Sequence, residues 1–204
     1  MSANRLSVHV PMGKLMLATP HVEDALRSCA ALLASRAGSI VLCLYGGQAG
    51  SHAESASRRA RQQQALRLLQ AKALQADLPA THRNPAAFAE LLRRQMQAHR
   101  PDCILLPCGL GHPPQRQIYH AGLLLAGSFP RLQWQLYDDI PMQTIDGALE
   151  QRLSYLDSAG IDATPWSLDA MPDLQQRQAA LALLGHADAA PCERYWRLQW
   201  RKAS

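Results

Sequence analysis

A short apolar segment that runs straight into a helix constrains this chain more than any other feature. Residues 14–19 are mostly apolar, and apolar residues then recur at helical spacing over residues 22–36. A buried strand followed at once by an amphipathic helix is typical of an open α/β sheet. In such sheets ligands bind beyond the carboxyl ends of the strands, which is where His21, Glu23 and Asp24 stand.

The three ionisable residues at this junction form a candidate metal and acid–base cluster. Imidazole and carboxylate groups are the side chains that bind divalent metals and that transfer protons. Alternatively, Glu23 and Asp24 only favour the positive N-terminus of the helix that they begin. His21 directly before the two acids favours the chemical interpretation.

Strands and helices alternate along the rest of the chain. The pattern predicts further strands at 39–45, 75–79, 103–107 and 132–137, and helices at 54–74, 85–99, after residue 112 and at 173–184. This alternation predicts one α/β domain over residues 1–204, with a Rossmann-like three-layer fold and a mostly parallel sheet. Strands 15–19, 40–45 and 103–107 are expected side by side at its centre.

Composition limits the class of protein. The chain has 204 residues, of which 48% are hydrophobic and 18% charged, so it can bury a substantial core. The net charge of +5 is modest, and Arg58, Arg59 and Arg61 form the only tight basic group. A solvated helix face explains that group better than a nucleic-acid site, so we expect no nucleic-acid partner.

The cysteines and the apolar segments indicate the cellular compartment in which the protein is expected. The five cysteines are odd in number and form no CxxC pair, which is typical of reduced thiols in a cytoplasmic protein. The N-terminus lacks the apolar run of a signal peptide, and no stretch approaches the roughly 20 apolar residues that a membrane span needs. The sequence leaves open whether the chain forms a homo-oligomer.

The junction sequence also resembles a known motif. Pro20-His21-Val22-Glu23-Asp24 is similar to the Pro-His-Pro-Asp-Asp motif of the PIG-L/LmbE-like N-deacetylases, which act on N-acetylglucosaminyl conjugates and related amides. The resemblance implies that His21 and Asp24 are ligands of a divalent metal, usually zinc. It implies that Glu23 is the general base.

A second stretch resembles the Gly-x-Gly-His-x-Asp-His motif of the same family. Gly109-Leu110-Gly111-His112 follows the strand at 103–107, and His112 matches the histidine that holds or protonates the reacting group. Gln115 stands where the last metal-binding histidine is expected, and glutamine binds zinc poorly compared with imidazole. His120 could replace it only if the helix begins irregularly; otherwise it is a surface or packed histidine.

The resemblance also suggests residues that bind substrate. Arg59 lies in a helix that resembles the family's Arg-x-x-Glu segment, with Gln62 in place of the acid and Gln70 in place of a later glycine. Asp138 and Asp139 follow the strand at 132–137, where sugar-active relatives have a Tyr-Glu-Asp-Leu-Pro-type segment. A solvated turn is the other interpretation of these two acids.

The predicted function is metal-dependent N-deacetylation, with zinc as cofactor and an N-acetylated sugar or amino-sugar conjugate as substrate. A non-catalytic relative that binds a carbohydrate or a protein partner is the alternative, because Glu23, Gln62 and Gln115 all depart from the family pattern. A nucleotide-binding protein is less well supported, because the glycines of residues 46–50 do not have GxGxxG spacing.

Overall fold

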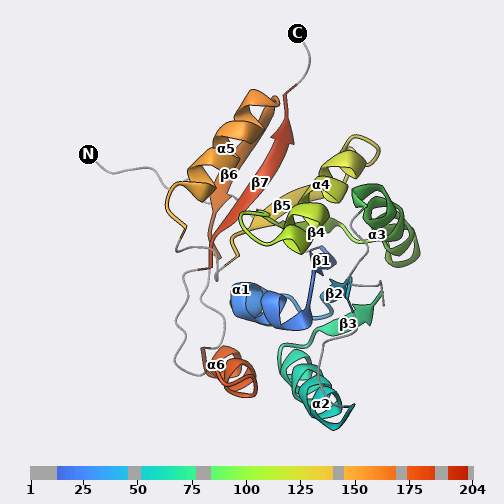
Figure 1. Cartoon of the computed structure of the whole chain (residues 1–204), viewed down its shortest axis with the longest axis vertical. Helices are drawn as coiled ribbons and strands as arrows, with labels where there is room; N and C mark the ends of the chain where they lie inside the picture. Colours follow the sequence, from blue (N-terminus) through green and yellow to red (C-terminus); the bar gives the residue numbers. More distant parts are fainter. Residues whose placement is uncertain are drawn as a thin grey trace.

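The computed structural model describes residues 13–45, 52–76, 84–139, 145–168, 174–186 and 193–201. A seven-stranded sheet lies between two layers of helices (Figure 1). Its strands are β1 (Leu15–Thr19), β2 (Ile40–Cys43), β3 (Lys72–Gln75), β4 (Cys103–Pro107), β5 (Gln133–Tyr137), β6 (Ile161–Trp166) and β7 (Tyr195–Trp200). The helices are α1 (Val22–Ala34), α2 (His52–Leu68), α3 (Pro85–His99), α4 (Pro113–Ala126), α5 (Ala148–Ser158) and α6 (Leu174–Ala182).

The strand order is β3-β2-β1-β4-β5-β7-β6, and β1 to β5 are parallel. This order confirms the Rossmann-like α/β prediction and the adjacency of the strands that begin at residues 15, 40 and 103. β7 runs antiparallel to both β5 and β6. The sequence prediction did not include β6, β7 or α5.

The two faces of the sheet have separate cores. One face packs with α1, α2 and α6, and the other with α3, α4 and α5 (Figure 1). β1, β2 and β4 supply apolar residues to both faces and are buried along their whole length. Buried parallel strands of this kind read as continuous apolar runs, which is why the sequence revealed them.

Helix ends follow local chemistry. Asn84 caps α3, because its Oδ1 accepts a hydrogen bond from the backbone N–H of Ala86 at 2.9 Å, and Pro85 occupies the first helical position. The prediction of a helix over 54–74 is too long at its C-terminal end. α2 ends at Leu68 and Gln70 takes a left-handed conformation with φ of 51°, so the next strand is 72–75 and not 75–79.

α1 is interrupted at Cys29, whose backbone leaves the helical region. Two backbone N–H groups beyond the break, those of Ala31 and Leu32, donate to the carboxylate of Glu193 at 2.8 and 3.3 Å. Tyr195 and Arg177 also contact this buried carboxylate. The break is therefore satisfied from the segment that leads into β7.

We expect Gly122→Ala to destabilise the protein. A Cβ at position 122 in α4 would fall far inside contact distance of the fully buried Leu106 side chain in β4. Overpacking of this kind costs about 1–3 kcal/mol, which urea unfolding would measure. Gly127→Ala is the matched control: a Cβ there meets nothing within 4 Å and φ is −61°, so its stability should stay the same or rise. Equal stabilities of the two variants would contradict this packing.

Candidate functional site

The strand order places the candidate site at the point where the sheet changes direction. The chain runs from β1 outward to β2 and β3, then returns to β4 on the other side of β1. α1 and α4 therefore leave neighbouring strands toward opposite faces, which opens a crevice at the carboxyl ends of β1 and β4. His21 follows β1, and His112 follows β4.

His21 is the N-terminal cap residue of α1 and is half-buried. Its carbonyl oxygen accepts hydrogen bonds from Thr19 Oγ1 at 3.0 Å and from the backbone N–H of Asp24 at 3.2 Å. Its ring lies 5.9 Å from the ring of Tyr45, whose hydroxyl donates to Gln117 Oε1 at 3.1 Å. Two successive side-chain contacts therefore link the end of β1 to the segment after β2, and that segment to α4.

Glu23 is held by two basic side chains. It forms an ion pair with Arg58 of α2, and its Oε1 lies 3.4 Å from Nε2 of His186. Burial disfavours the charged form, but the hydrogen bonds and charges of Arg58 and His186 outweigh it, so the pKa of Glu23 lies below its usual value. Glu23 is thus ionised and ordered.

The pKa values of Asp24 and Asp139 are shifted in the opposite direction, above their usual values. Burial raises the pKa of Asp24, against the charge and backbone N–H of His21. Burial also raises the pKa of Asp139 to about 6, with further contributions from Asp24 and Asp138, against the amide of Gln115. The segments after β1 and β5 and the first turn of α4 therefore meet around a pair of acids.

Gln115 is almost fully buried, and its Oε1 has no hydrogen-bond partner among the residues that the structure describes. His112, by contrast, is exposed at the start of α4. His120 is also exposed, and its ring packs edge-on against Tyr119. The convergence of His112 and His21 in one pocket stays a prediction.

The three residues predicted to bind substrate differ in how far they are buried. Arg59 is exposed on α2, while its neighbour Arg58 is the residue that reaches Glu23. Asp138 is fully buried in an ion pair with Arg194, and Asp139 is 1% exposed. A role for these residues in binding substrate stays a prediction.

Arg152 of α5 holds the turn that carries the second motif, a role that no sequence pattern indicated. Its Nη2 donates to the carbonyl of Gly109 at 2.9 Å, and its guanidinium lies 4.1 Å from the centre of the Tyr119 ring. Gly109 has φ of 67°, and a Cβ there would crowd Tyr119 and Arg116. A glycine is therefore required at this turn.

The donor set for zinc is incomplete. No group of three or more His, Cys, Asp or Glu side chains in the described ranges is arranged to hold a metal ion. Besides His21 and Asp24, the predicted ligand set contains only the amide of Gln115, and an amide binds zinc poorly. The residues present do not fit a zinc site with three protein ligands.

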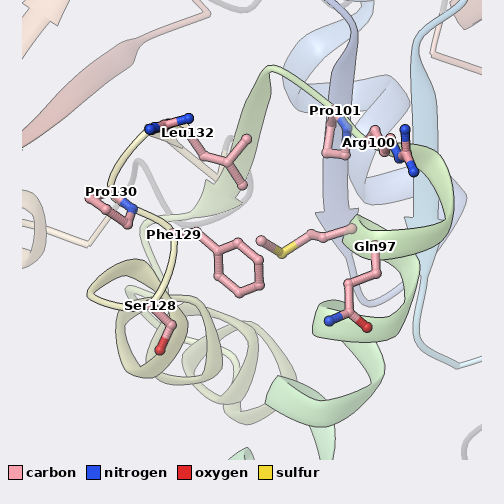
Figure 2. Close-up of a pocket in the computed structure, with 9 residues that line it drawn as sticks. Gln97, Arg100, Pro101, Ser128, Phe129, Pro130 and Leu132 are labelled. Atoms are coloured by element: carbon pink, nitrogen blue, oxygen red, sulfur yellow. The ribbon is translucent and has the colours of Figure 1, made fainter.

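A pocket of about 620 Å³ lies elsewhere, between the C-terminal ends of α3 and α4 (Figure 2). Figure 2 shows the ring of Phe129 at its centre. Pro101 and Leu132, which also line it, precede β4 and β5, so the pocket opens at the amino edge of the sheet. No acid, histidine or cysteine lines it, so it is not the candidate site.

No family model and no curated protein sequence matches the chain, but fourteen chains of solved structures do. The A40926 pseudoaglycone deacetylase Dbv21 is 18% identical, with a TM-score of 0.67 over 95% of this chain and 100% of that one. The zinc-inhibited form of the teicoplanin deacetylase Orf2 is 16% identical, with a TM-score of 0.67 over 94% and 100%. The N,N'-diacetylchitobiose deacetylase from Pyrococcus horikoshii is 15% identical, with a TM-score of 0.51 over 87% and 71%.

The chain has the fold of these deacetylases, which confirms the resemblance to the PIG-L/LmbE-like family at the level of the fold. A different kind of enzyme shares it: GalB, the 4-carboxy-2-hydroxymuconate hydratase from Pseudomonas putida, is 12% identical, with a TM-score of 0.58 over 94% of this chain and 98% of that one. The reaction must therefore be argued from the site. In the described part of the chain, no helix is long and apolar enough to cross a membrane.

We expect Asp139→Asn to change how stability depends on pH. With a pKa of about 6 against an ordinary 3.8, folded Asp139 keeps a proton between about pH 4 and 6 that the unfolded chain has released. Stability is therefore lost as the pH rises through this window. The variant removes that loss, so it should gain up to about 2–3 kcal/mol at pH 8 and nothing at pH 3.5. Urea unfolding between these pH values measures the difference, and parallel curves would contradict it.

Proposed function

We propose that the protein hydrolyses the N-acetyl amide of a sugar or amino-sugar conjugate at the carboxyl ends of β1 and β4. The observation that carries this proposal is the contrast among three carboxyl groups that follow β1 and β5, in which Glu23 has a lowered pKa while Asp24 and Asp139 have raised ones. Acids with strongly different environments at a sheet edge are typical of acid–base sites. The solved deacetylases of the same fold supply the reaction class.

In this proposal Glu23 takes the proton of the attacking water. It is ionised, and its contacts with Arg58 and His186 fix its orientation. His112 stabilises the developing oxyanion or protonates the leaving amine, since it is exposed at the start of α4. Arg59 and the segment of Asp138 and Asp139 contact the sugar. Because the lowered pKa makes Glu23 a weak base, slow turnover is expected.

Binding without hydrolysis is the second candidate function, and a separate observation supports it. Glu23 is already paired with Arg58 and His186, and the zinc donor set is incomplete in the described ranges. A site in this state could recognise an N-acetylated sugar with the same side chains. Catalysis and binding then differ only in whether amine is released.

Amine release from an N-acetylglucosamine conjugate tests the proposal. We expect slow release by the natural protein and a loss of at least about 100-fold in Glu23→Gln, since a general base contributes about 10²–10⁴. Arg61→Gln is the control on α2: Arg61 is exposed and its Nη1 donates to Ser57 Oγ, so this variant should match the natural protein. Binding of the conjugate without amine release would support the second function, and neither binding nor release would overturn both.

Metal content tests the incomplete donor set. We expect the purified natural protein to carry far less than one zinc per chain, and Gln115→His to raise that content because an imidazole completes the ligand set. Gln115→Leu is the control of similar burial and should stay near zero. Mass spectrometry of the native proteins gives the stoichiometry. Near-stoichiometric zinc in the natural protein would contradict this account and would point to another third ligand.

A further inference from the structure

A second group of buried polar side chains lies apart from the candidate site. Gln135 of β5 is 0% exposed, and neither its Nε2 nor its Oε1 has a hydrogen-bond partner among the described residues. Arg197 in β7 and Arg36, which follows α1, are half-buried, and the buried atoms Nε and Nη2 of Arg197 and Nη1 of Arg36 also have no hydrogen-bond partner among the described residues. Nearly all buried polar groups in folded proteins are paired, so this concentration requires an explanation.

The sheet register brings these side chains together. Gln135 lies directly opposite Arg197 in the antiparallel pair of β5 and β7. Side chains opposite each other in such a pair point to the same face, with Cβ atoms about 4.5–5.5 Å apart. Tyr137 and Tyr195, two residues along each strand, pack in the core on the α1 side, so by alternation Gln135 and Arg197 point to that side as well.

Arg36 reaches the same place from the end of α1. Burial raises the pKa of the Cys103 thiol, at the start of β4, to about 12, and this rise is opposed by the charge of Arg36, by its hydrogen bond to the thiol and by the charge of Arg197. The two guanidinium groups therefore lie near one thiol. Asp102 is the acid that also acts on this thiol, but it is exposed, and its Oδ2 accepts from the backbone N–H of Lys14 at 2.7 Å.

The chemistry of the cluster defines what it would bind. Arginine N–H groups match the oxygens of an oxyanion, and neither arginine forms an ion pair with an acid among the described residues. The Gln135 amide offers one more donor, Nε2, and one acceptor, Oε1. A ligand that satisfies all of these groups needs several acceptor oxygens and one hydroxyl.

We propose that Arg36, Gln135 and Arg197 form a binding site for a small oxyanion that carries a hydroxyl, such as hydrogen phosphate. The site is distinct from the candidate active site. Cys103 is the first residue of β4, whereas His112 and Asp139 lie beyond the carboxyl ends of β4 and β5. The proposal does not depend on the proposed deacetylase function.

Calorimetric titration and thermal unfolding with sodium phosphate, sulfate and acetate, at constant ionic strength, test it. We expect phosphate to bind the natural protein saturably, and its Kd to rise at least tenfold in Arg197→Met. Arg131→Met is the control with the same loss of charge at an exposed residue, and it should keep the natural Kd. Sulfate, which lacks the hydroxyl, should bind the natural protein more weakly than phosphate, and Gln135→Leu should abolish that difference.

The unliganded proteins give an independent readout. Without phosphate, Arg197→Met should unfold at the same temperature as the natural protein or higher, because the change removes two buried N–H groups, Nε and Nη2, that have no partner among the described residues. No saturable phosphate binding, or the same Kd in Arg197→Met and Arg131→Met, would overturn the proposal. If Arg197→Met does not fold, Gln135→Leu decides: unchanged preference for phosphate over sulfate overturns it. Acetate binding as tight as phosphate binding would also overturn it, since acetate carries no hydroxyl at neutral pH.

Discussion

The parallel pairing of β1 with β4 is the interaction on which the candidate site depends. Leu15, Met16 and Leu17 pair with Cys103, Ile104 and Leu105, so two segments about 90 residues apart in the chain end at one edge. The backbone ladder, not any contact between the two motifs, brings them there. Because α1 and α4 then diverge to opposite faces, the edge stays open between them. The pairing thus creates both the proximity and the space that a ligand needs.

The same edge gives identical groups different properties. Glu23 meets Arg58 and His186 and is stabilised as an anion, whereas Asp24 and Asp139 are desolvated and hold their protons more strongly. The difference comes from what packs beside each carboxyl group: Arg58 of α2 and His186 outweigh burial at Glu23, whereas burial outweighs His21 at Asp24 and Gln115 at Asp139. The helix dipole alone, which the sequence offered as an alternative explanation, acts on Glu23 and Asp24 alike and does not separate them.

The sequence predicted elements whose signals are local. α3 has its capping asparagine, its proline and its apolar spacing within one stretch, and β4 is a continuous apolar run. Gln70 shows where local rules fail: it takes the left-handed conformation that a glycine usually supplies, so the helix before it was predicted too long. The contacts of the site residues could not be predicted for a different reason. Arg58 and Arg59 are adjacent in the sequence, and only the packing of α2 decides which of them reaches Glu23. The burial of Asp138 depends on Arg194, at the entry to the antiparallel β7 that the sequence did not predict.

Two buried polar features show how this chain treats unpaired groups. At the break in α1, the free N–H groups of Ala31 and Leu32 are met by Glu193, so the helix that begins with the candidate site residues keeps its position on the sheet. Satisfaction of that kind is what stability requires of a buried polar atom. At Oε1 of Gln115, and again at the Gln135 amide with Nε and Nη2 of Arg197, the described residues provide no such partner. The N–H groups at the α1 break are paired, whereas these amide and guanidinium atoms are not. Their burial costs free energy of folding, and stability alone does not explain that cost. Groups left open in this way are where a ligand gains binding energy without displacing an existing hydrogen bond, which is why both features direct attention to recognition instead of stability.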